Sequence, residues 1–126
     1  MDTRNKILTV EAALALAPAR PLAVVAGLFD LVRSAHVRAL RDVRDRTGAA
    51  ALLAVVLPQA GTVQTQRVRA EMAAALCMID YVVTTDVADL HRIAAALHAD
   101  AVAHLEEDDA ARVRELIAHV HSRQIR

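Results

Sequence analysis

The sequence predicts a single three-layer α/β/α domain with a mostly parallel sheet. Continuous apolar runs such as 22–26 and 49–58 are typical of strands that are covered on both faces. Segments with helical periodicity lie between these runs, so that strands and helices alternate along the chain. The length of 126 residues suits one domain, residues 1–126, that buries its own core.

The charge balance excludes one class of function. Fifteen Lys and Arg side chains match 15 Asp and Glu side chains, so the formal net charge is zero. Binding to nucleic acid that is driven by overall charge is therefore not expected. The only lysine is Lys6, and all other basic side chains are arginines apart from the histidines. This bias fits either phosphate recognition by guanidinium groups or a GC-rich genome.

Other features of composition indicate a cytoplasmic protein without a membrane partner or a metal centre. The N-terminus lacks the apolar core of a signal peptide, and charged residues interrupt every stretch long enough to span a membrane. Cys77 stands alone in an apolar helical run, so we expect a buried structural thiol. Five histidines lack metal-ligand spacing and are expected at the surface or an interface: His91, His98, His104, His119 and His121.

The first half of the chain predicts two helices and two strands. Thr9 is expected to cap a helix over 10–17 that prolines at 18 and 21 end, and a strand follows at 22–26. Ser34 is expected to cap a helix over 34–47, and Gly48 to end it. The second strand is expected within 49–58. The buried stripe of the longer helix is Val37, Leu40 and Val43.

The second half of the chain continues the alternation. A polar loop is expected at 59–65, where ligands bind in such sheets, and a helix over 66–78. A strand at 81–84, a helix over 88–98 capped by Asp86 or Thr85, and a short fourth strand at 100–105 follow. An acidic run at 106–109 precedes a last helix over 110–121. The expected buried face of the helix over 66–78 comprises Val68, Met72, Ala75, Leu76 and Ile79.

The stretch 22–40 carries the candidate site. It runs from an apolar strand through Gly27 into a cluster of polar side chains and then into a helix: Asp30, Arg33, Ser34 and His36. A strand, a glycine turn and a polar helix start form the corner of an α/β sheet that usually faces phosphate.

This corner resembles a known signature. GLFDLVRSAHVRAL, residues 27–40, is similar to the G-x-F-D-x-x-H-x-G-H-x-x-x-L motif of the nucleotidylyltransferase superfamily. Segments 6–15 and 69–86 resemble further stretches of its cytidylyltransferase-like branch, which includes glycerol-3-phosphate cytidylyltransferase and the adenylyltransferase domain of ADP-heptose synthase. The resemblance implies a Rossmann-like fold, ATP or CTP with Mg²⁺, a phosphorylated small-molecule partner and a homodimer. It implies nucleotide contacts and catalysis from Gly27, Phe29, Asp30, Arg33, His36 and Arg69.

This sequence departs from the family pattern at the positions that the resemblance implies for catalysis. Arg33 stands at the first histidine of H-x-G-H and Ala35 at its glycine, whereas His36 keeps the second histidine. Pro58 and Gln59 replace a Ser-Asp pair, no loop lysine follows, and the late I-S-T-T segment is absent. Nucleotidyl transfer brings two anions together, and each lost donor typically costs about 10²–10³ in rate.

We therefore predict a degenerate nucleotidylyltransferase-like protein with weak or no catalysis that retains a nucleotide or phosphate pocket or an interaction role. One alternative is an active adenylyl- or cytidylyltransferase that uses Arg33 and His36 on a sugar- or polyol-phosphate. Another is a structural or regulatory dimer module with a vestigial pocket.

Each candidate side chain also has a structural interpretation. Asp30 either supports the site or binds N–H groups of the turn and the following helix. His36 contacts phosphate or is a satisfied interface histidine, and Arg33 is a phosphate clamp or a replacement at a decayed site. Arg69 faces the nucleotide or pairs with a carboxylate such as Asp80.

Overall fold

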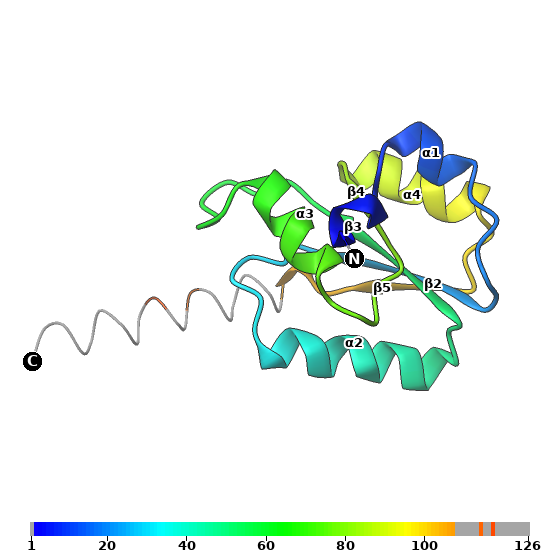
Figure 1. Cartoon of the computed structure of the whole chain (residues 1–126), viewed down its shortest axis with the longest axis horizontal. Helices are drawn as coiled ribbons and strands as arrows, with labels where there is room; N and C mark the ends of the chain where they lie inside the picture. The colour runs from blue at the N-terminus through cyan, green and yellow to red at the C-terminus, as the bar shows by residue number, and fades with distance from the viewer. Residues whose placement is uncertain (1, 108–113, 115–116, 118–126) are drawn as a thin grey trace, which may run out of the picture.

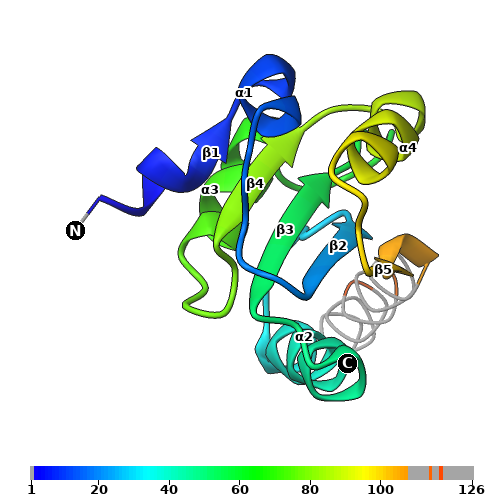
Figure 2. The same cartoon turned by 90° about the vertical axis from the view of Figure 1, so that its right-hand side faces the viewer.

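The fold is a five-stranded parallel sheet between two layers of helices. The computed structural model describes residues 2–107, 114 and 117. The strand order is β1-β4-β3-β2-β5, and every pair is parallel, as Figure 2 shows for its central strands. The strands are β1 (Ile7–Leu8), β2 (Leu22–Gly27), β3 (Ala51–Val56), β4 (Tyr81–Thr84) and β5 (Ala101–His104). This architecture confirms the predicted Rossmann-like fold class.

The helices cover both faces of the sheet (Figures 1 and 2). One face carries α1 (Val10–Leu14) and α4 (Val87–Ala96), and the other carries α2 (Ser34–Thr47) and α3 (Gln66–Ala74). A short 3-10 helix, η1 (Thr3–Lys6), precedes β1. Among the residues that the structure describes, no helix is long and apolar enough to cross a bilayer.

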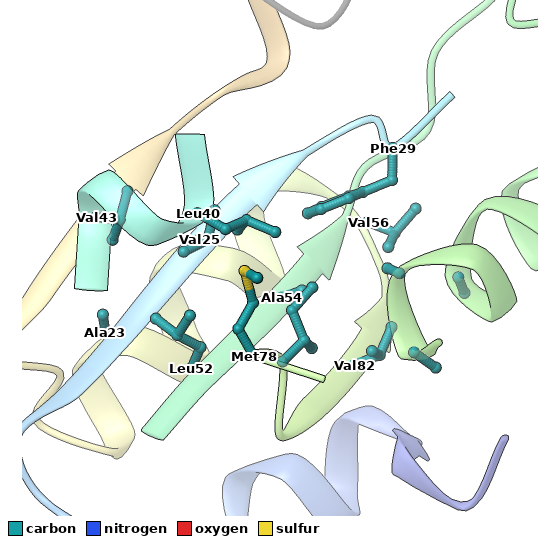
Figure 3. Close-up of a cluster of buried hydrophobic side chains, with 14 of the residues drawn as sticks. Ala23, Val25, Phe29, Leu40, Val43, Leu52, Ala54, Val56, Met78 and Val82 are labelled. Carbon is teal, nitrogen blue, oxygen red and sulfur yellow. The ribbon is translucent and has the colours of Figure 1, made fainter. Parts of the chain in front are cut away.

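Two apolar clusters, one on each face of the sheet, form the core. Every residue of β2 and β3 is buried, as the continuous apolar runs predict. On one face, Leu40 and Val43 of α2 pack against β2 and β3, and Figure 3 shows them beside Val25. On the other face, Leu90 and Ile93 of α4 pack against the opposite side chains of the same strands. Aliphatic side chains therefore make up nearly all of the core.

The predicted count of four strands is wrong, because a fifth strand lies near the N-terminus. β1 has only two residues, and it pairs with Val82 and Val83 of β4 at the edge of the sheet. Two residues are too few to produce a period-2 pattern. Pairing with a buried strand, rather than local sequence, makes this segment a strand.

The predicted buried face of α3 is also wrong. The helix ends at Ala74 rather than at 78, and it buries Arg69, Ala70, Ala73 and Ala74. Val68 and Met72 remain 39% and 38% exposed. Alanines lack side-chain bulk, so this face lets the helix lie close to the sheet and leaves the larger side chains outside. Ile79 is buried as predicted, but it lies beyond the helix.

Several predicted boundaries shift by a few residues. α1 ends at Leu14, and α4 begins at Val87 with Asp86 as its N-cap, whose carboxylate accepts the Asp89 N–H at 2.9 Å. Gly48 ends α2 with φ of 66°, as predicted. Cys77 is exposed, so the predicted buried thiol is wrong. The predicted helix over 110–121, with His119 and His121, lies outside the described residues, apart from Arg114 and Ile117.

Candidate functional site

The carboxyl edge of the sheet carries a small cavity. Gly27, Val56 and Thr84 end their strands in register, so the segments that follow β2 and β3 emerge side by side. A cavity of about 210 Å³ lies against these segments, and we call it the loop cavity. Its described lining residues are Leu28, Asp30, Gln59, Ala60, Gly61, Thr62, Arg114 and Ile117. The polar loop after β3 therefore lines a cavity at the edge where ligands were expected.

Hydrogen bonds to Asp30 connect this loop to the turn after β2. The Asp30 side chain is buried, and its two carboxylate oxygens accept the N–H groups of Val63 at 2.7 Å and Gln64 at 2.9 Å. In return, the side-chain oxygen of Gln64 accepts the Leu31 N–H at 3.1 Å. Asp30 thus binds loop N–H groups far along the chain, rather than those of its own turn or of α2. We call these three hydrogen bonds the Asp30–Gln64 clip.

The backbone around Asp30 is strained. Phe29 and Leu31 have φ values of 53° and 54°, in the left-handed region that costs about 1–2 kcal/mol for a residue with a Cβ. Neither residue is a glycine, so surrounding contacts must hold them there. The clip supplies such a contact at Leu31, whose N–H it binds. Strain of this kind is concentrated at sites that need one fixed loop geometry.

Arg69 connects the segments that follow β2 and β3. The residue is 2% exposed, and Nη1 donates to the carbonyls of Leu28 and Leu57 at 2.8 Å each. Burial lowers the pKa of Arg69, and the nearby Asp30 carboxylate raises it in part. The alternative pairing with Asp80 is wrong, because Asp80 accepts the Leu52 N–H near the start of β3, at the opposite edge. Arg69 therefore stabilises the positions of Leu28 and Leu57 next to the site.

His36 lies inside the protein, in the first turn of α2. Its ring has no exposed surface, and Nδ1 accepts the Arg33 N–H at 3.1 Å. The ring also stacks against Phe29, with ring centroids 6.4 Å apart. This arrangement makes Arg33, rather than the predicted Ser34, the N-cap of α2. His36 therefore fixes the helix start and does not line the loop cavity.

The only lysine lies at the opposite end of the sheet. Lys6 Nζ donates to the carbonyls of Leu76 and Ile79, at 3.2 and 2.8 Å, in the segment that leads into β4. That segment is at the amino edge, because β4 runs from Tyr81 to Thr84 toward the cavity. No lysine side chain is therefore available to the loop cavity.

Only one of the predicted site residues lines the loop cavity. Asp30 does so, whereas Gly27, Phe29, Arg33, His36 and Arg69 are not among its lining residues. The sequence analysis missed Gln64, which completes the clip, and Arg114, the one basic side chain among the described lining residues. The polar character of the loop was the available signal for Gln64. Among the described residues, no group of three His, Cys, Asp or Glu side chains is placed to hold a metal ion.

Comparison with known proteins identifies a similar fold. No protein-family model matches the chain, and no curated protein matches its sequence. One solved structure that does match is that of the lipopolysaccharide core biosynthesis protein from Thermoplasma volcanium GSS1, with a TM-score of 0.56. The two chains are 15% identical, and the match covers 64% of this chain and 70% of that one. At this level of identity the likeness is one of fold.

Proposed function

We propose that the protein binds a nucleotide or another phosphorylated small molecule at the carboxyl edge of its sheet and has lost efficient nucleotidyl transfer. The likeness in fold to a lipopolysaccharide core biosynthesis protein supports a nucleotidylyltransferase-like ancestry. The burial of His36 is the observation that supports the loss of efficient nucleotidyl transfer. A histidine without exposed surface, bound to its own helix start and stacked on Phe29, does not reach an α-phosphate unless the corner opens.

Two further observations support loss of catalysis. The single lysine stabilises the amino edge, so the loop lysine of the resembled family has no counterpart here. Asp30 is buried and both of its oxygens accept loop N–H groups, so its contacts are those of a structural acceptor rather than of a Mg²⁺ ligand. No step of the proposal therefore uses a metal ion.

Retained binding is supported by the donors around the loop cavity. Arg114 supplies a guanidinium, and Ala60, Gly61 and Thr62 of the loop form part of the lining. A guanidinium and backbone N–H groups are the usual partners of phosphate oxygens. The cavity of about 210 Å³ is small, and it suits a phosphoryl-sized group better than a whole nucleotide.

Pyrophosphate release tests the loss of catalysis. We expect little or none from ATP or CTP with Mg²⁺ and either glycerol-3-phosphate or heptose-1-phosphate. Robust metal-dependent turnover would contradict the proposal and favour an active transferase. In that case, Arg33→Ala, which keeps the backbone N–H bound to His36, should reduce the rate.

Thermal unfolding tests the retained pocket. ATP, CTP, AMP and CMP are added separately, since a ligand at 100 times its Kd stabilises a protein by about 2.7 kcal/mol. We expect at least one nucleotide to raise Tm, and Arg114→Gln to reduce the shift. If no nucleotide raises Tm at millimolar concentration, the pocket is vestigial and the structural-module alternative is favoured.

A further inference from the structure

A second cavity lies beside the loop cavity, toward α4. It has a volume of about 460 Å³ and lies between the ends of β2 and β3 and the first turn of α4. It shares Leu28 and Gln59 with the loop cavity, so the two are neighbours. Most of its described walls are apolar: Leu28, Leu57, Pro58, Val87 and Ala88. We call it the α4 pocket, and its volume is typical of sites for small molecules.

The charged side chains among the described lining residues of the α4 pocket are of one sign. Its described lining includes the carboxylates of Asp86 and Glu106, and it includes no lysine, arginine or histidine. Asp86 uses one oxygen to cap α4. This charge pattern is opposite to that of the loop cavity, whose lining includes Arg114. The α4 pocket therefore does not suit a phosphate group.

Glu106 has an unused acceptor. One carboxylate oxygen, Oε1, lies 3.0 Å from His104 Nδ1. The other, Oε2, is buried and has no hydrogen-bond partner within the part of the chain that the structure describes. A carboxylate oxygen that is withdrawn from water without a donor is destabilising, so such atoms are rare in native proteins. A positive charge in the adjacent pocket would offset this cost by attracting the carboxylate.

We propose that the α4 pocket binds a small organic cation, with an apolar body against Leu57 and Val87 and an ammonium group beside the Glu106 carboxylate. The apolar walls favour a hydrocarbon or aromatic body. The carboxylates favour a positive charge. This inference goes beyond the proposed function, because such binding requires neither a nucleotide nor Arg114.

Amide NMR with two matched probes tests this inference. Benzylamine is cationic at pH 7, and benzyl alcohol has nearly the same shape without the charge. Each is titrated into ¹⁵N-labelled full-length protein. We expect benzylamine to shift the amide signals of Leu57, Val87 and Ala88, with saturation at millimolar concentration. Benzyl alcohol is expected to bind at least about tenfold more weakly, because it lacks the charge-assisted hydrogen bond.

Paired variants identify the residues responsible. Glu106→Gln should weaken benzylamine binding by about tenfold or more, whereas Glu107→Gln, at the exposed neighbouring carboxylate, should leave it unchanged. Ala88→Leu should fill the pocket and abolish the shifts. Ala96→Leu places the same side chain at an exposed position of α4 away from the pocket. This control variant should leave the benzylamine-induced shifts intact.

The inference is overturned if benzylamine shifts amides elsewhere or shifts none. It is also overturned if both probes bind equally, or if Glu106→Gln binds as well as Glu107→Gln. Circular dichroism confirms that each variant is folded, and Ala88→Leu provides a second test if Glu106→Gln does not fold. If benzylamine does not bind but a nucleotide raises Tm in the same preparation, the inference about the α4 pocket fails while the proposed binding at the loop cavity stands.

Discussion

At the scale of single residues, Asp30 shows how one side chain sets the geometry of the candidate site. Its two oxygens bind two consecutive N–H groups of the loop, and the strained Phe29 and Leu31 flank it. Asp30→Asn replaces one acceptor by an NH₂ group that faces an N–H donor. We expect a loss of about 1–3 kcal/mol in the free energy of unfolding, measured with urea.

Asp45→Asn is the matched control, because Asp45 is an exposed carboxylate on α2. It should change the free energy of unfolding by less than about 0.5 kcal/mol. Equal effects of the two substitutions would show that the clip contributes nothing to stability.

Asp100 provides a prediction about pH. Its Oδ2 accepts the Leu22 N–H at 2.7 Å and pairs with Arg20 Nη1 at 3.0 Å, and these contacts lower its pKa below the ordinary value of 3.8. A lowered pKa in the folded state stabilises the protein at pH values above the unfolded pKa. This stabilisation is lost as the pH falls through the folded value.

Asp100→Asn should remove this contribution, since an amide does not titrate. The free energy of unfolding of the variant should fall less steeply than that of the wild type between about pH 5 and pH 2. The comparison uses urea midpoints at several pH values. Parallel curves for the two proteins would show that Asp100 does not carry the effect.

At the scale of elements, helix α3 shows that the most hydrophobic side chains of a helix are not always the buried ones. Its buried face is made of three alanines and Arg69, whereas Met72 is 38% exposed. We expect Met72→Ala to change the free energy of unfolding by less than about 0.5 kcal/mol. Ala73→Leu adds bulk to a fully buried position and should cost about 1–3 kcal/mol. A larger loss from Met72→Ala would support the face predicted from the sequence.

The elements also show what the sequence predicted and why. The long buried strands, Gly48 and the caps at Thr9 and Asp86 follow from local chemistry, so pattern alone located them. β1 depends on pairing with a distant strand, and no local pattern marks it. The buried face of α3 depends on how closely a helix approaches the sheet, which periodicity does not measure.

The sequence predicted a ligand-binding loop after β3, and the structure places a cavity there, but the contacts around this cavity were not predicted. The loop after β3 was expected to lie where ligands bind, and it lines the loop cavity. The partners of Asp30 are 33 and 34 residues away in sequence, so only the fold reveals that this carboxylate binds the loop. The burial of His36 likewise depends on tertiary packing, because a motif specifies residue types and not exposure.

At the scale of the whole molecule, the sheet joins two cores into one unit. β2 and β3 contribute alternate side chains to the cluster under α2 and α3 and to the cluster under α1 and α4. Each helical layer packs its apolar residues against one face of these strands. Loss of either layer would expose one face of both central strands, so the two cores should unfold together.

Substitutions in opposite layers test this cooperativity. Leu40→Ala and Ile93→Ala each truncate a fully buried side chain, one in α2 and one in α4, and each should cost about 2–5 kcal/mol. If the sheet couples the layers, each variant shows a single urea transition that is shifted to lower concentration. The transitions followed by far-ultraviolet circular dichroism and by fluorescence of Tyr81, the only tyrosine, should coincide. A variant in which Tyr81, on the α4 side of the sheet, reports unfolding before the helices are lost would show that the layers unfold separately.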